Sequence, residues 1–300
     1  MLRSMYAGIS GLKNFQTKLD VIGNNISNVN TYGFKKGRTV FSDLYSQTVS
    51  GASAATNTRG GVNPKQVGLG AQMAAIDTLH AQGSTQFTGN TLDLAIAGDG
   101  FFVLKDSGEN QNFTYTRAGN FYMDKNGSLV DSNGKYLHGA ASTPATPPSF
   151  IDAENSPTIT YGPTGNPIAG AGSDLVSPIR IPTDAQSVSV GNDGKVLFVD
   201  AAGDLKYAGQ LIMAKFPNAG GLQKQGENYF VNSSNSGDPL YSTATEKGTG
   251  AVKSGSLEMS NVDLSEEFTE MIVAQRGFQA NTRIITTSDE ILQELVNLKR

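Results

Sequence analysis

Two histidines, His80 and His138, are the only imidazole side chains in this chain, and imidazole is the commonest acid-base group in enzymes. A hydrolytic triad would place one of them beside a nucleophile and an acid. Each lies in a strand-like run, and neither is near a Gly-x-Ser-x-Gly elbow or a clustered pair of acids. The sequence therefore favours histidines at a surface or sheet edge and predicts no catalytic residue.

Three short glycine-containing motifs could bind a cation or a phosphate. Asp124-Lys125-Asn126-Gly127 and Asp131-Ser132-Asn133-Gly134 resemble parts of calcium loops, but the later glutamate that completes such a loop is missing. Gly98-Asp99-Gly100 is not followed by a phosphate-binding lysine and a helix. Asn-Gly dipeptides are typical of tight hairpin turns. We therefore expect turns between strands, with no metal ion and no cofactor.

The composition indicates a modest core with many turns. Of 300 residues, 38% are hydrophobic and 35 are glycine, which predicts an elongated protein rather than a large enzyme interior. There is no cysteine, so disulfides and thiolate metal sites are excluded. A net charge of -4 with scattered lysine and arginine leaves no basic stripe, so we expect no nucleic-acid partner.

Neither a membrane span nor a cleavable leader is predicted. No run approaches the roughly 18 consecutive apolar residues that a spanning helix needs. The first 20 residues carry Arg3, Lys13, Lys18 and Asp20 within a helical pattern and lack a small-residue cleavage site. We expect a soluble protein or part of an assembly, with no membrane insertion.

The N-terminal segment has the apolar periodicity of an amphipathic helix that ends near Asn28. One row alternates spacings of three and four, the period at which one helix face keeps meeting a neighbouring helix. A further row makes the apolar face wider than a contact with one helix requires. The first row is Leu2, Met5, Ile9, Leu12, Gln16, Leu19, Gly23 and Ile26, and the further row is Phe15, Ile22 and Val29.

The C-terminal segment repeats an apolar residue every seven positions, and a second row lies beside the first. Ser260, Asn261 or Asp263 could cap this helix, with Glu266 and Glu267 near its positive end. From both ends, the predicted assembly interface is Leu2, Met5, Ile9, Leu12, Phe15, Leu19, Ile22, Ile26, Val29, Leu264, Phe268, Met271, Phe278, Ile284, Ile285, Ile291, Leu292, Leu295 and Leu298.

Two interpretations of these faces compete. The terminal helices could pack on each other inside one globular domain, as most amphipathic helices do. Alternatively, part of each wide face stays exposed in a single copy, and such patches usually mark an association surface. We favour the second and expect the helices to be frayed in the free subunit until neighbouring copies bury them.

Short strand-like runs and turns fill the middle of the chain, so the predicted fold class is α+β, mainly β. Terminal coiled-coil helices are joined by linkers to a discontinuous β domain with a small insertion. Eight of the 11 prolines lie between 141 and 182, which predicts an excursion at a tip or edge. The expected divisions are an assembly helix at 1–30, a connecting segment at 31–70, β domain at 71–140 and 179–250, an insertion at 141–178, and an assembly helix at 251–300.

Long stretches of the chain resemble the bacterial flagellar rod and hook protein family. The N-terminal match runs from Leu2 through Leu12 and from Leu19-Asp20-Val21-Ile22-Gly23-Asn24-Asn25 to Lys35. The stretches Ser260–Asn281 and Leu295–Leu298, and the interior runs Leu92–Phe102 and Tyr115–Phe121, look most like the hook members. Only the proline-rich excursion lacks a counterpart.

The resemblance implies a structural subunit, not an enzyme, that self-assembles into the hook, a curved hollow tube acting as a universal joint between rod and filament. Implied partners are other copies, the rod, hook-cap and hook-filament junction proteins, and the type III export apparatus, with an extracellular location reached without a cleavable signal. Many hook proteins carry a larger outer domain than 141–178 allows. The distal rod protein, a straight drive shaft, is therefore the alternative.

Two rivals belong to other classes. A secreted binding module would use the Ala141–Pro178 tip and would keep binding after both termini were deleted. A hydrolase would use His80 or His138 and would lose activity when both became alanine. The sequence supports neither with a constellation of residues.

Overall fold

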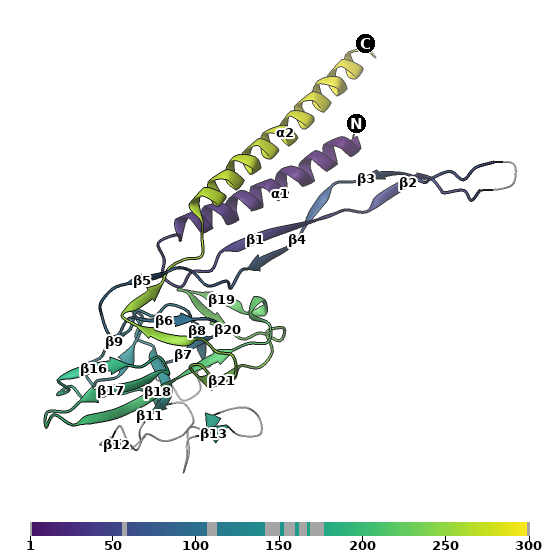
Figure 1. Ribbon diagram of the computed structural model, residues 1–300. Helices are drawn as coiled ribbons and strands as arrows, with labels where there is room; N and C mark the ends of the chain where they lie inside the picture. The colour runs from purple at the N-terminus through teal and green to yellow at the C-terminus, as the bar shows by residue number, and fades with distance from the viewer. Residues whose placement is uncertain are drawn as a thin grey trace. The chain divides into compact units, whose positions relative to one another are not determined.

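The chain divides into two compact units in the computed structural model (Figure 1). The helix unit comprises Met1–Val29, Lys36–Leu79 and Val262–Arg300, and the β unit comprises Asn30–Lys35 and His80–Asn261. The structure describes residues 2–55, 59–106, 113–141, 151–152, 160–161, 167–168 and 177–298. The mainly β, α+β class expected from the sequence is confirmed.

Two terminal helices, α1 (Leu2–Ser27) and α2 (Leu264–Asn297), lie antiparallel in the helix unit (Figure 1). Asp263 caps α2 by accepting hydrogen bonds from the backbone N–H groups of Ser265 and Glu266, so one of the three predicted caps is confirmed. Within the described residues, neither helix has both the length and the hydropathy to cross a bilayer.

A long two-stranded arm completes the helix unit. Strand β1 (Gly37–Asp43) pairs antiparallel with β4 (Ala71–Thr78), and farther along the same ribbon β2 (Ser46–Ser50) pairs with β3 (Lys65–Gly68). Nearly every side chain of β2 and β3 is exposed. We call residues 37–55 and 59–78 the β arm.

The β unit is built on one large antiparallel sheet with the strand order β16-β17-β18-β11-β7-β8-β20-β19. Further short strands pair with β11 and β18, and three small ladders, β5 with β23, β6 with β22 and β13 with β14, lie outside it among the described residues. The strands are β5 (Thr85–Phe87), β6 (Leu94–Ala97), β7 (Phe101–Lys105), β8 (Thr114–Thr116), β9 (Tyr122–Met123), β10 (Leu129–Val130), β11 (Tyr136–Ala141), β12 (Ile151–Asp152), β13 (Thr160–Tyr161), β14 (Pro167–Ile168), β15 (Ser177–Pro178), β16 (Ser187–Val190), β17 (Lys195–Val199), β18 (Leu205–Lys215), β19 (Gln223–Gly226), β20 (Tyr229–Val231), β21 (Leu240–Thr243), β22 (Ala251–Ser254) and β23 (Ser256–Glu258), with a 3-10 turn η2 (Ala219–Gly221).

Alternate side chains of the central strands supply two buried clusters. In β7, Phe102 and Leu104 join a cluster with Phe121 and Met213, whereas Phe101 and Val103 join a second cluster. This alternation follows from the two-residue repeat of a strand. Because both faces are covered, the central strands read as continuous apolar runs.

The predicted turns lie where the sequence placed them. Asn126-Gly127 joins β9 to β10, and Asn133-Gly134 joins β10 to β11. Gly127 and Gly134 adopt φ values of 77° and 83°, which glycine tolerates without steric cost. Among the described residues there is no group of three or more histidine, aspartate or glutamate side chains that could hold a metal ion.

The unit boundaries differ from the expected divisions. The β unit begins at His80 rather than at 71, because Ala71–Thr78 pairs with β1 and belongs to the β arm. Part of the expected connecting segment is likewise strand. At the other end, residues 251–258 form β22 and β23, and the helix begins at Leu264. The predicted insertion at 141–178 lies largely outside the described residues.

Candidate assembly surface

Small residues bring α1 and α2 close together. A Cβ atom added to Gly277 would lie 2.5 Å from Phe15 Cζ, so the aromatic ring occupies the space that a larger residue would fill. Added to Gly8, a Cβ would lie 3.3 Å from Ile285 Cγ1. Both distances are tighter than most Cβ contacts, so a side chain at either glycine would require its neighbour to shift.

The contact between the helices follows one row on each. On α1 the row runs through Gly8, Gly11, Phe15, Lys18, Ile22 and Asn25, again with spacings of three and four. On α2 it includes Glu267, Glu270, Gly277, Asn281 and Ile285, with Ala274 fully buried. We call these two rows the seam.

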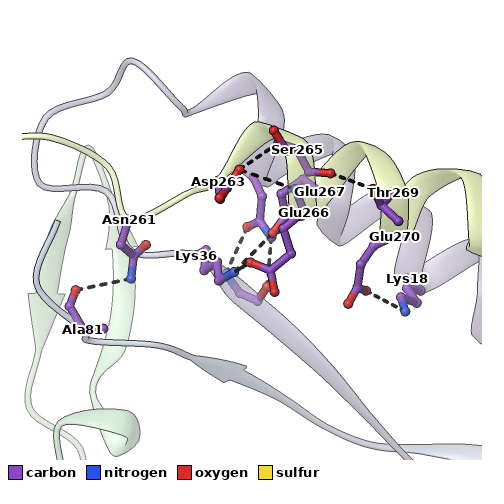
Figure 2. Close-up of polar contacts among 12 residues, drawn as sticks. Lys18, Lys36, Ala81, Asn261, Asp263, Ser265, Glu266, Glu267, Thr269 and Glu270 are labelled. Carbon is purple, nitrogen blue, oxygen red and sulfur yellow. Dashed lines mark hydrogen bonds and ion pairs between the residues drawn. The ribbon is translucent and has the colours of Figure 1, made fainter. Parts of the chain in front are cut away.

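A polar cluster closes the seam near the start of α2 (Figure 2). Lys36 Nζ lies 2.6 Å from Glu266 Oε2 and 3.7 Å from Glu267 Oε1. Burial disfavours the charge on Lys36, but the hydrogen bond and attraction of Glu266, aided by Glu267, outweigh it and raise the pKa of Lys36. One turn farther along α2, Glu270 pairs with Lys18 at 2.7 Å.

Asn25 is the buried centre of this cluster, with 2% of its surface exposed. Its side-chain amide donates to the Gly37 carbonyl at 2.9 Å, and its oxygen accepts from the Gly37 N–H at 3.0 Å. The same amide donates to Glu267 Oε2 at 3.1 Å. One side chain therefore joins α1, α2 and the start of β1. Around it lies a cavity of about 260 Å³.

The β arm covers a second side of α1. Asn14 donates to the Ala71 carbonyl at 2.8 Å. A Cβ added to Gly70 would lie 3.3 Å from Ala7 Cα, and Gly70 has a φ of 125°. The arm and α2 thus occupy two different sides of α1, and the predicted row of Met5, Ile9 and its partners lies on a third.

The outer half of α2 leaves an apolar row in solvent. Ile284, Ile291 and Leu295 are each nearly half exposed, and Leu298 is 82% exposed. Nearer the start of α2, Phe268 and Ile272 are also about half exposed, as is Ile9 on α1. Most of these large apolar residues recur at helical spacing, so they form stripes rather than scattered exceptions.

The structure places the predicted interface residues in three environments. Ile22 is buried within the seam, and the side chain of Leu2 lies outside the described residues. The half-buried residues are Met5, Leu12, Phe15, Leu19, Ile26, Val29, Met271, Phe278, Ile285 and Leu292. The exposed residues are Ile9, Leu264, Phe268, Ile284, Ile291, Leu295 and Leu298.

Sequence reasoning missed two kinds of residue. Gly8, Gly11 and Gly277 shape the seam, but a count of large apolar side chains passes over them. Ile272 and Val273 are exposed on α2 and lie outside the predicted rows. Their apolar character was visible in the sequence, but neither falls on the seven-residue repeats that defined those rows.

The two histidines lie in buried surroundings rather than at a catalytic surface. The His80 ring packs edge-on against Phe101 and Phe230, with ring centroids 5.6 and 5.3 Å away. Burial, and then the charges of Lys35, Arg117 and Lys224, lower its pKa to about 4. His138 is buried on β11 beside Phe113. The predicted edge or surface location is therefore wrong for both, because aromatic packing covers them.

Three protein-family profiles match the chain along its length. They are described as flagella basal body rod protein at residues 5–35, flagellar hook protein FlgE/F/G D1 domain at residues 95–198, and flagellar basal body rod FlgEFG protein C-terminal at residues 253–298. The chain therefore belongs to the family of flagellar rod and hook proteins, a family of structural proteins.

Rod proteins and hook proteins both align with the whole chain. The flagellar basal-body rod protein FlgG of Bacillus subtilis (strain 168) is 54% identical over 301 residues, covering all of both chains. In Borreliella burgdorferi, the rod protein FlgG is 35% identical over 304 residues and the flagellar hook protein FlgE is 32% identical over 444 residues, each with full coverage of both chains.

Proposed function

We propose that this chain is the subunit of the distal rod of the bacterial flagellum, a straight drive shaft. The observation that supports it best is length. The alignments with rod proteins span 301 and 304 positions, whereas the alignment with the hook protein spans 444 positions against the 300 residues of this chain. A hook relative therefore has a long segment for which this chain has no equivalent.

The hook, which the interior motifs suggested from sequence, is the second candidate. Two spirochaete hook proteins match over the whole chain at 32% and 31% identity, so the family resemblance extends to both subunits. The 54% identity with a rod protein favours the distal rod over the hook. We therefore propose a straight rod in place of the curved hook tube expected from the sequence.

Assembly rests on the exposed apolar stripes of the terminal helices. Each fully buried Ile, Leu or Phe side chain contributes roughly 1.5 to 3 kcal/mol, before the entropy of ordering is subtracted. The exposed Ile, Leu and Phe residues of α2 and its C-cap are Leu264, Phe268, Ile272, Ile284, Ile291, Leu295 and Leu298. Burying them between copies supplies enough free energy for a cooperative polymer, and the predicted interface is retained in this sense.

The β arm provides a second contact between copies. An isolated two-stranded ribbon is marginally stable in water, yet β2 and β3 have no covering element among the described residues of the helix unit. Tyr45 and Val49 are 79% and 65% exposed on it. A neighbouring copy that covers these side chains would stabilise the arm and resist bending of the polymer.

The proposed partners follow from this role. They are further copies of the chain, neighbouring rod and hook components, and the export apparatus that delivers subunits to the growing structure. The proposed location is the basal body, outside the cytoplasm.

Electron microscopy of the assembled protein tests the proposal directly. Purified chain concentrated to the point of polymerisation should form straight hollow rods. Introduced into a Bacillus subtilis strain that lacks its own FlgG, the chain should restore flagella, whereas the same strain with an empty vector should stay bare. Curved tubes, together with failure to replace FlgG, would support the hook instead.

A further inference from the structure

The buried carboxylate of Glu258 contacts the three segments of the β unit at which the chain enters or leaves that unit. The chain crosses four times, after residues 29, 35, 79 and 261. The three β-unit segments next to these crossings are 30–35, 80–84 and 258–261. Glu258, at the end of β23, belongs to the third and reaches the other two.

The first segment is held by both the backbone and the side chain of Glu258. Gly33 N–H donates to the Glu258 carbonyl at 2.8 Å, and Lys35 Nζ lies 2.5 Å from Glu258 Oε1. Lys35 also donates to the Ala81 carbonyl at 2.9 Å, which links the first segment to the second. The side chains of Lys35 and Glu258 are both fully buried.

The second segment is held by the same carboxylate. Gly83 N–H donates to Glu258 Oε1 at 3.0 Å. Glycine is required there, because a Cβ at position 83 would lie 2.1 Å from the Met259 carbonyl oxygen. Next to it, Met259 N–H donates to the Ser84 carbonyl at 2.8 Å, and Asn261 donates to Ala81 at 3.3 Å (Figure 2).

Arg117 fixes the carboxylate from the sheet side. Its Nη1 lies 3.2 Å from Glu258 Oε2, and its Nη2 donates to the Gly98 carbonyl at 2.8 Å. Two cations therefore share one buried carboxylate. Removing Glu258 would leave both buried cations unpaired, whereas removing Lys35 would leave a neutral Arg117–Glu258 pair.

We propose that Glu258 is an anchor that ties the crossing segments to the β unit, so that a pull or twist on one segment is shared among all of them. Without it, each segment would detach by itself while the sheet stays folded. The purpose, passing torque between the units of a drive-shaft subunit, rests on the proposed function. The anchoring is a property of the single chain.

Hydrogen exchange of the purified full-length protein tests the anchor. In Glu258→Gln, the amides of Gly33, Gly83 and Met259 should exchange at least ten-fold faster, while those of β7 and β18 keep their rates. In Lys35→Met, the acceleration should be confined to Gly33 and its neighbours, because the Arg117–Glu258 pair still holds Gly83. Asp106→Asn is the matched control, since Asp106 pairs with Lys135 at 3.8 Å away from the anchor, and it should change none of these rates.

Two outcomes would overturn the proposal. One is unchanged exchange in Lys35→Met, a variant that keeps a neutral buried pair and decides the question if Glu258→Gln does not fold. The other is equal acceleration across the whole β unit, which would make the cluster an ordinary contributor to stability. Straight or curved polymers from the parent chain would bear on the proposed function and not on this result.

Discussion

Phe15 of α1 lies directly against Gly277 of α2, and a Cβ atom at position 277 would lie 2.5 Å from its ring. The two residues are more than 260 positions apart in the chain, yet the absence of a side chain at one sets the fit of the other. Close helix contacts of this kind depend on small residues because a larger one forces the helices apart.

Gly277→Ala should therefore destabilise the helix pair. Alanine favours the helix by about 1 kcal/mol over glycine, but displacing the Phe15 ring costs roughly 1 to 3 kcal/mol, so we expect a net loss. Gly23→Ala is the matched control, since nothing lies within 4 Å of a Cβ there, and it should be stabilising. Urea unfolding followed by the helical circular dichroism signal measures both. Equal stabilisation by the two variants would contradict the tight contact.

Ile291→Asp should abolish polymerisation without unfolding the subunit. Ile291 is 47% exposed, so the monomer should change by less than about 0.5 kcal/mol, whereas a carboxylate in an interface between copies would be buried without a partner. Sedimentation gives the polymer fraction and urea unfolding gives the stability. Thr286→Asp, at an exposed position on the opposite side of the outer half of α2, should polymerise normally.

Ile285→Asp should behave differently from Ile291→Asp. Ile285 is half-buried and packs against Gly8 within the seam, so a charge there should separate the helices of a single copy as well as prevent assembly. We expect reduced helical signal in the monomer, while the near-ultraviolet signal of the β unit stays unchanged. A fully helical monomer would show that the seam does not hold α1 to α2.

Asn25→Asp should weaken the helix unit by about 2 to 4 kcal/mol. The change removes the donor to the Gly37 carbonyl and places a second carboxylate beside Glu267. Glu270→Gln breaks only the partly exposed pair with Lys18 and should cost less than about 1 kcal/mol. Thermal unfolding of the two variants side by side gives the comparison, and similar losses would count against a buried role for Asn25.

His80 should make the β unit less stable in acid. Its pKa is lowered to about 4 in the folded chain, from an ordinary value of 6.5 in the unfolded chain. As pH falls from 6.5 towards 4, the unfolded chain binds a proton that the folded chain does not, so stability declines, by an amount on the order of 3 kcal/mol. In His80→Phe this part of the decline should disappear. Urea unfolding between pH 7 and 4 tests it, and an identical slope in both proteins would show that His80 is not responsible.

The C-terminal helix was the element most accessible to sequence reasoning. Its seven-residue repeat, its cap at Asp263 and its acidic first turn all act over short sequence distances. Met271, Phe278 and Ile285 of this repeat are half-buried, with Ile285 against Gly8 of α1, and the parallel row of Ile284 and Ile291 is exposed. Whether copies cover that second row stays a prediction.

The N-terminal helix was harder because its contact with α2 is made by the residues that hydrophobic patterns ignore. The pattern predicts a first apolar row of Leu2, Met5 and Ile9, but the seam follows the further row at Phe15, with Gly8 and Gly11 beside it. Glycine counts as a break in a helical pattern, and its value at a close contact depends on what lies opposite. A single sequence does not contain that information.

The buried ion pairs of the β unit were beyond reach for a different reason. Lys35 and Glu258 are 223 positions apart, and each alone resembles an ordinary surface charge. Local patterns predict which segments are strands, and they do not predict which charges meet after the strands pair. The choice between hook and rod was also out of reach, because the motifs that the chain shares with the family lie in parts common to both subunits.

The antiparallel pairing of α1 and α2 also has a consequence for synthesis. Ser27 ends the first helix and Leu264 begins its partner, so the ribosome must make the entire β unit before α1 can pair with α2. During most of its synthesis, a nascent chain therefore exposes the apolar face of α1 that α2 later covers. Premature aggregation at this stage, rather than instability of the finished subunit, is the hazard that such an architecture must manage.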